Sequence, residues 1–150
     1  MIVALDTNVL SELTRPLPAT AVLQWARAQD PGRIFTTAVC EAELLYGVAL
    51  LPAGKRRDQL AQAIDVMLNT VLGGRVLPFD RAAARCYAAL ADERRRRGRP
   101  VGFADLQIAA IAQASGADAV ATRNVRDFAE TGLSVIDPWQ SHGGVPPQNA

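Results

Sequence analysis

The chain has 150 residues, 49% of them hydrophobic, which is enough for one domain with a sizeable core and too few for two typical domains. Its net charge of +1 gives no sign of a nucleic-acid partner by itself, although five arginines fall between residues 94 and 99. The first apolar run, at 2–5, is too short for a signal peptide and no stretch reaches the length of a membrane span, so we expect a cytoplasmic protein that does not enter a membrane.

Short apolar runs alternate with longer amphipathic segments, which is typical of repeated β-α units around a parallel sheet. Strands are predicted at 2–5, 33–37, 75–79, 119–122 and 134–137. Helices are predicted at 9–14, 19–29, 39–51, 55–72, 81–97 and 105–115, with Asp80 as the N-cap of the fifth and Gly116 ending the sixth. The pattern predicts an α/β domain over residues 1–139 with one sheet of about five short strands, and a flexible tail over 140–150.

Missing residue types narrow the possible chemistry. His142 is the only histidine and Lys55 the only lysine, so Ser-His-Asp and Cys-His catalytic sets are not expected. Neither glycine-rich nucleotide-binding motif is present. Cys40 and Cys86 lack the spacing of a zinc or redox site, and we interpret them as buried, reduced thiols. Any chemistry must therefore depend on carboxylates, arginines, hydroxyls or a bound metal.

Asp6 follows the first predicted strand directly, at the end of the strand where open parallel sheets place their sites. The alternative is that Asp6, Thr7 or Asn8 only caps the following helix. Because Thr7 or Asn8 would cap that helix equally well, Asp6 has no structural role that it alone would fill.

Two further segments place acids on apolar helices. Glu41 and Glu43 are the only charges of the third helix and point to different sides of it, so periodicity cannot choose which one faces inward and either could be solvated. Asp105 opens the sixth helix on the same face as Ile108, Ala109 and Ala112, where it is either buried or an N-cap. Each of these positions is unusual for a carboxylate.

Buried carboxylates repel one another unless a positive charge joins them. Mg²⁺ or Mn²⁺ would supply that charge, because these hard cations prefer oxygen ligands. In an α/β domain almost without lysine or histidine, a cluster of the acids would indicate a metal-dependent phosphoryl-transfer site.

The order of the motifs LDTNVLSEL, AELLYGV, ADLQIAAIA, VATRNVRDF and VIDPW resembles that of PIN-domain ribonuclease toxins of the VapC family, in particular the FitB-like branch. The resemblance covers residues 1–139. It implies a three-layer α/β/α PIN-like domain with a central parallel sheet, and a toxin of a type II toxin-antitoxin system.

Carried over residue by residue, the resemblance implies that Asp6, Glu43 and Asp105 are the catalytic acids that hold the metal, and so selects Glu43 over Glu41. Thr7 and Asn8 match residues that orient the first aspartate, and Thr122 matches a hydroxyl beside the metal. The family's fourth polar position matches Asn124, where some members carry aspartate, and Asp127 follows one helical turn later. Whether one or two metals bind is therefore open. The residues that would support the metal site are Thr7, Asn8, Thr122, Asn124 and Asp127.

The resemblance further implies hydrolysis of an RNA phosphodiester with Mg²⁺ as cofactor, Mn²⁺ being the alternative. It also implies a homodimer and a VapB-like antitoxin that blocks the site. The apolar surface of 39–51 is a candidate for either contact, although ordinary core packing explains it as well. The arginine run is then a candidate for RNA-backbone contacts, or it is a solvated helix end. The arginines of this run are Arg94, Arg95, Arg96, Arg97 and Arg99.

Arg123, outside the run, is either a phosphate contact or a surface arginine.

Two other functions compete with this one. A phosphatase with a nucleophilic aspartate, as in haloacid-dehalogenase-like proteins, would require an aspartate at position 8 and a late lysine, but Asn8 stands there and no lysine follows Lys55. A PIN-like RNA-binding or interaction module without catalysis is the non-enzymatic alternative, although all three acids are present.

Overall fold

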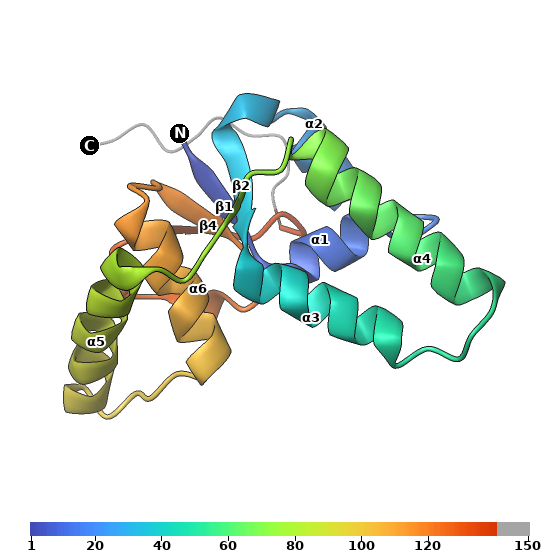
Figure 1. Ribbon diagram of the computed structural model, residues 1–150. Helices are drawn as coiled ribbons and strands as arrows, with labels where there is room; N and C mark the ends of the chain where they lie inside the picture. The colour runs from blue at the N-terminus through green and yellow to red at the C-terminus, as the bar shows by residue number, and fades with distance from the viewer. Residues whose placement is uncertain (141–150) are drawn as a thin grey trace.

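A five-stranded parallel sheet lies at the centre of the computed structural model, which describes residues 1–140 (Figure 1). The strand order is β3-β2-β1-β4-β5, and each neighbouring pair is parallel. The predicted sheet of five short strands is confirmed, although each strand is shorter than expected. The strands are β1 (Val3–Leu5), β2 (Ile34–Thr37), β3 (Val76–Leu77), β4 (Ala119–Ala121) and β5 (Ser134–Ile136).

All six predicted helices are present, together with two short segments that the sequence pattern did not reveal. A 3₁₀ turn precedes β2, and a four-residue helix follows β4; both are too short to produce a helical period. The predicted helix at 55–72 corresponds to α4 and the π-helical turn that continues it. The segments are α1 (Thr7–Leu13), α2 (Thr20–Arg27), η1 (Pro31–Arg33), α3 (Ala38–Ala49), α4 (Lys55–Val66), η2 (Met67–Val71), α5 (Arg81–Arg96), α6 (Phe103–Ala114) and α7 (Val125–Phe128).

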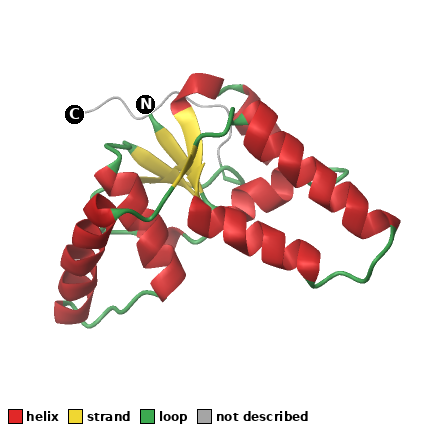
Figure 2. Cartoon of the chain, in the orientation of Figure 1, coloured by secondary structure: helices red, strands yellow, loops and turns green. Residues whose placement is uncertain are grey.

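Helices cover both faces of the sheet (Figure 2). The connections from β1 to β2 and from β2 to β3 run in one direction along the sheet and carry α1 to α4, whereas the connection from β3 to β4 runs back and carries α5 and α6. Because crossovers between parallel strands are right-handed, the two directions put these helices on opposite faces. This confirms the expected three-layer α/β/α fold.

β1 and β4 are apolar at every position because both strands lie in the core. Both strands are central in the sheet and wholly buried, because helices cover both of their faces. Along α6, Ile108, Ala109 and Ala112 are buried, as the helical period predicts. α6 packs against β2 and β4, and Asp105 in its first turn comes within electrostatic range of Asp6 at the carboxyl end of β1.

The strand order reverses between β1 and β4, since the chain proceeds from β1 to β2 on one side while β4 lies on the other. In open α/β sheets, such a reversal opens a crevice at the carboxyl ends of the two strands. The residues that directly follow these strands are Asp6 and Thr122. The sheet topology thus brings two of the predicted site residues to one place.

Three other predictions concern features away from the sheet. Cys40 is a buried free thiol, as expected, whereas Cys86 is free but only half-buried. Among residues 1–140, no helix combines the length and apolar character needed to cross a membrane. The tail predicted for 140–150 lies, from residue 141 onward, outside the described residues.

Candidate active site

Asp6 is both the N-cap of α1 and a buried carboxylate at the end of β1. Only 2% of its surface is exposed, and its Oδ1 accepts a hydrogen bond of 2.8 Å from the backbone N–H of Thr7. Its carbonyl oxygen accepts from the N–H of Val9 at 3.1 Å. Of the three residues considered as caps, Asp6 is therefore the N-cap, and Thr7 and Asn8 lie inside α1. Capping holds one side of the Asp6 carboxylate in a fixed position.

The other oxygen of Asp6 is held by Thr122, which directly follows β4, and by Asn8 of α1. Thr122 Oγ1 donates to Asp6 Oδ2 at 2.6 Å, and Asn8 Nδ2 lies 3.3 Å from both that oxygen and Thr122 Oγ1. Asn8 Oδ1 accepts in turn from the N–H of Arg123 at 3.2 Å. These bonds join the ends of the two neighbouring strands, so the carboxylate cannot turn without breaking several of them.

Glu43 approaches this group from α3. Thr7 Oγ1 donates to Glu43 Oε1 at 2.9 Å, and α3 is itself fixed at its start by Thr37, whose hydroxyl accepts from the N–H of Cys40. The negative charge of Glu43 also acts on Asp6 and Asp105. The fold thus resolves the choice that periodicity left open, because Glu43 and not Glu41 lies with Asp6.

Asp105 is the third residue of α6, which begins at Phe103 after Gly102 as the N-cap. The expectation that Asp105 opens or caps the helix is wrong, since the helix starts two residues earlier. The side chain is half-buried in the first turn, near the positive end of the helix dipole. Burial, followed by the negative charges of Asp6, Asp127 and Glu43, nevertheless raises the pKa of Asp105 to about 6.

Asp127, in α7, completes the acidic cluster, which we define as Asp6, Glu43, Asp105 and Asp127. A hydrogen bond between Asp127 and Asp105 favours a proton on Asp105. Burial also raises the pKa of Asp6, and the charges of Glu43 and Asp127 add to the rise. The hydrogen bonds from Thr122 and Thr7 lower the pKa and so oppose it.

Asn124 contributes through its backbone, because its N–H donates to Thr122 Oγ1 at 3.0 Å while its side chain is exposed.

The acidic cluster has no positive partner in the described part of the chain, since every ion pair found within residues 1–140 involves other acids. Within the same residues, no three His, Cys, Asp or Glu side chains form a preassembled metal cage. Mg²⁺ does not need one, because it is usually held by one or two carboxylates and keeps several waters. The donor set and its unbalanced negative charge fit such a cation.

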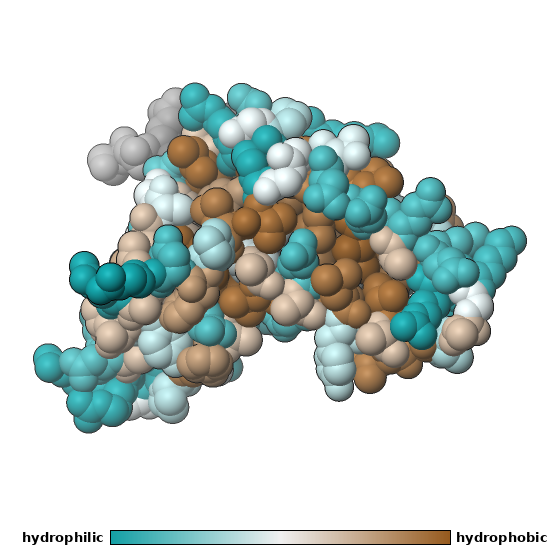
Figure 3. All heavy atoms as spheres, viewed as in Figure 1, coloured by the Kyte–Doolittle hydropathy of each residue, from teal (hydrophilic) through white to brown (hydrophobic). Residues whose placement is uncertain are grey.

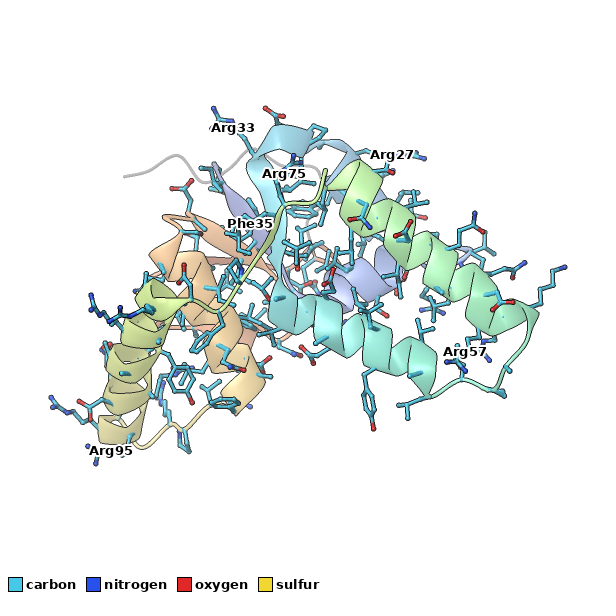
Figure 4. All side chains as sticks on the ribbon, in the orientation of Figure 1. Arg27, Arg33, Phe35, Arg57, Arg75 and Arg95 are labelled. Carbon is cyan, nitrogen blue, oxygen red and sulfur yellow. The ribbon has the colours of Figure 1, made fainter. Side chains whose placement is uncertain are left out.

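The predicted RNA-binding arginines do not form a single group. The Arg94 side chain is 4% exposed and donates to backbone carbonyls, so the expectation that it contacts RNA is wrong. Its neighbours are exposed around the end of α5, where Figure 4 shows Arg95 far from the sheet. They pair with Asp92, Glu93 and Glu130. The exposed members are Arg95, Arg96, Arg97 and Arg99.

Two features near the site had no recognisable signal in the sequence. Arg123 stacks on Trp139, with its guanidinium carbon 4.4 Å from the ring centroid, so this side chain packs against the protein surface. Arg94 and Glu130 form an ion pair close to α7, at 3.6 Å. A buried arginine inside a run of four arginines looks like its neighbours until the fold is known.

Comparison with known proteins agrees with this geometry. The PIN domain model matches residues 3–133. The VapC ribonuclease Y4jK of Sinorhizobium fredii is 44% identical over 138 residues, which are 92% of this chain and 98% of that protein. The toxin FitB of Neisseria gonorrhoeae is 35% identical over 137 residues, 91% and 98% of the two chains. The crystal structure of FitAcB from that organism superposes with a TM-score of 0.85 at 34% identity, covering 93% of this chain and all of that one. The chain therefore belongs to the PIN-domain family, in the group of VapC- and FitB-type proteins.

Proposed function

We propose that this protein is the toxin of a type II toxin-antitoxin system and acts as a metal-dependent endoribonuclease at the acidic cluster. The proposal rests on one observation. Four carboxylates, on Asp6 after β1 and on α3, α6 and α7, lie close enough for their charges to act on one another where the strand order reverses, without a positive partner among the described residues. The names of the relatives, a ribonuclease and a toxin, support the same activity.

Mg²⁺, or Mn²⁺ in its place, would be held chiefly by Asp6 and Asp105, with Glu43 bound directly or through water. When bound, the cation supplies Lewis-acid activation of a water and neutralises charge on the phosphate. Because Asp6 is fixed by Thr7, Asn8 and Thr122, its orientation does not depend on the substrate. Such preorganisation reduces the free energy spent on aligning the reacting groups.

The remaining carboxylates suggest how a proton is moved during hydrolysis. Glu43 is exposed and is oriented by the hydroxyl of Thr7, so it can accept a proton from the attacking water. This role needs no histidine or lysine, in agreement with the composition of the chain. Asp127 would add a further negative charge to the group of acids that holds the cation.

RNA would approach along a surface that combines acidic and basic parts. The exposed arginines at the end of α5 carry more positive charge than the acids Asp92, Glu93 and Glu130 offset. Contacts from such arginines to phosphates hold a strand without reading its sequence. Figure 3 shows hydrophilic side chains gathered over this end of the molecule and over the start of α4.

A homodimer and a VapB-like antitoxin are part of the proposal. The exposed apolar side chains of α3 offer a surface for one of these contacts, since Leu45, Tyr46 and Leu50 are each more than half exposed. Figure 3 shows hydrophobic residues across the middle of this face of the molecule. Gel filtration with light scattering, alone and with the co-expressed antitoxin, would measure both assemblies.

The decisive experiment incubates the purified protein with a panel of RNAs, with Mg²⁺ or Mn²⁺ and with EDTA, beside Asp6→Ala and Asp105→Ala variants. Cleavage that requires metal and is lost in both variants is the expected result. Cleavage that survives in both variants, or in EDTA, would contradict the site. RNA binding without any cleavage would instead favour an interaction module.

A further inference from the structure

Arg94 occupies an unusual position for an arginine, because it is buried yet lies in the most basic part of the chain. It belongs to the last turns of α5, but its guanidinium reaches α7 and the residues that follow it. Nη2 donates to the carbonyl oxygens of Arg126 at 3.3 Å and Asp127 at 3.1 Å, and Nη1 lies 3.6 Å from Glu130 Oε2. Burying a charge in this way is costly unless its partners are fixed.

The contacts of Arg94 complete the hydrogen bonding of a helix that could not form alone. The four carbonyls of α7 have no partners within so short a helix. The N–H of Ala129 satisfies that of Val125, and the hydroxyl of Thr131 satisfies that of Phe128. Arg94 satisfies the two between them, and its charge lies at the negative end of the helix dipole. Within residues 1–140, Arg94 is therefore the one side chain from another element that donates to these carbonyls.

One of those carbonyls belongs to Asp127, whose carboxylate is part of the acidic cluster. The backbone of Asp127 is held by Arg94, while the negative charge of its side chain acts on Asp105 and Asp6. The pair formed by Arg94 and Glu130 is itself constrained, since Glu130 has a left-handed backbone with φ of 61° and also lies 3.1 Å from Arg97 Nη1.

We infer that Arg94 is a positioning residue, which acts on the metal-dependent cleavage of RNA through the backbone of Asp127. The inference rests on the proposed function for its activity readout. An arginine is required because its planar fork donates to two carbonyls and a carboxylate at once, whereas a lysine is a single point charge. The buried side chain itself touches neither RNA nor metal.

A double-mutant cycle separates this role from a general effect on folding. The rate of cleavage is measured for the wild type, Arg94→Met, Asp127→Ala and the double variant. If Arg94 acts through Asp127, each single substitution lowers the rate roughly 10- to 100-fold, and Arg94→Met lowers it less than about threefold further when Asp127 is already alanine. An equal loss from Arg94→Met in both backgrounds would overturn the inference, because the effect would then not pass through Asp127.

Mn²⁺ affinity, measured by titration calorimetry on the same four proteins without RNA, gives a readout that does not depend on cleavage. Here too, Arg94→Met should weaken binding in the wild-type background and have little further effect beside Asp127→Ala. If the wild type cleaves no RNA, the proposed function fails while this cycle still decides the role of Arg94. Affinity and rate within twofold of the wild type in a folded Arg94→Met variant would overturn it.

Two further variants serve as controls. Arg33→Met removes an exposed arginine from η1, at the opposite edge of the sheet (Figure 4), and should leave rate and affinity unchanged. Arg94→Lys keeps the charge, so it provides a folded variant if Arg94→Met does not fold. Its cleavage rate and Mn²⁺ affinity should lie between those of the wild type and of Arg94→Met. A wild-type rate and affinity in Arg94→Lys would refute the requirement for a planar guanidinium.

Discussion

Thr122 Oγ1 donates a 2.6 Å hydrogen bond to Asp6 Oδ2, and this bond joins the residues that follow β1 and β4, the two strands between which the strand order reverses. The residues are 116 positions apart in the chain, and both are buried. The bond orients the carboxylate on which the proposed site depends, and it lowers the pKa of Asp6 against the effect of burial. Substitution of Thr122 therefore tests how far the site depends on a fixed orientation of the Asp6 carboxylate.

Thr122→Val replaces the hydroxyl with a methyl group of similar size. We expect RNA cleavage to fall about tenfold and the free energy of unfolding to fall by about 1 kcal/mol, because Asp6 loses a hydrogen bond in a buried setting. The pKa of Asp6 should rise, so the acid limb of the pH-rate profile should move to higher pH. Thr122→Ser retains the donor and should remain near wild type. A profile that is identical in the valine variant would show that the bond does not control Asp6.

Asp105→Asn should stabilise the metal-free protein at neutral and higher pH. The pKa of Asp105 is raised from its ordinary value of 3.8 to about 6, so the folded state holds the proton more tightly than the unfolded state. The wild type therefore loses stability as the pH rises from about 4 to about 6, and the loss is complete above that window. Because water screens the half-buried group, the gain in the variant should be at most about 1 kcal/mol.

Thermal unfolding in EDTA at pH 4 and pH 8 measures this effect. The asparagine variant should melt about 2–4 °C above the wild type at pH 8 and close to it at pH 4. A wild type that is more stable than the variant at pH 8 would show that a positive partner, and not repulsion, surrounds Asp105.

Glu43→Gln and Glu41→Gln form a matched pair, because the residues lie two positions apart on one helix. The first substitution removes the charge that lies beside Asp6 and Asp105, and we expect it to lower the cleavage rate at least tenfold. The second changes a side chain outside the acidic cluster and should leave the rate within about twofold of the wild type. Comparable losses in both variants would mean that the assignment of Glu43 is wrong.

Arg95→Gln combined with Arg96→Gln tests the basic surface at the end of α5. Both side chains are exposed and share Asp92 as a partner, so their removal should not disturb the core. We expect RNA binding to weaken and its dependence on salt concentration to become shallower, by about one in the log-log slope for each phosphate that the variant no longer neutralises. Arg33→Gln is the control, and an unchanged slope in the double variant would assign the arginines to the solvated helix end.

The sequence predicted the strand positions and the helical faces well, because burial on both sides of a parallel sheet leaves a clear apolar pattern. It predicted less well the details that depend on contacts between distant residues. Asp6 caps α1 and also belongs to the acidic cluster, two roles that the sequence pattern presents as alternatives. The choice between Glu41 and Glu43 came from the family resemblance, and only the contact with Thr7 explains it physically.

Other parts of the site lay beyond sequence reasoning for identifiable reasons. The four residues of α7 are too few to show a period, and the helix depends on Arg94, which lies 33 positions before Asp127. The start of α6 was predicted two residues late, because the exposed Phe103 and half-buried Ala104 do not extend the apolar stripe. Such features arise from tertiary packing, which a single sequence does not record.

A single titration shows whether the acidic cluster binds a divalent cation and hydrolyses RNA. The initial rate of cleavage of a single RNA is followed as Mg²⁺ is added to the wild type and to Asp6→Asn, which keeps the shape of the side chain and removes its charge. We predict that the wild-type rate rises with Mg²⁺ and saturates, while that of the folded variant stays at least 100-fold lower at every concentration. If the variant cleaves at the wild-type rate, or the wild type needs no cation, the acidic cluster is not a metal-dependent nuclease site.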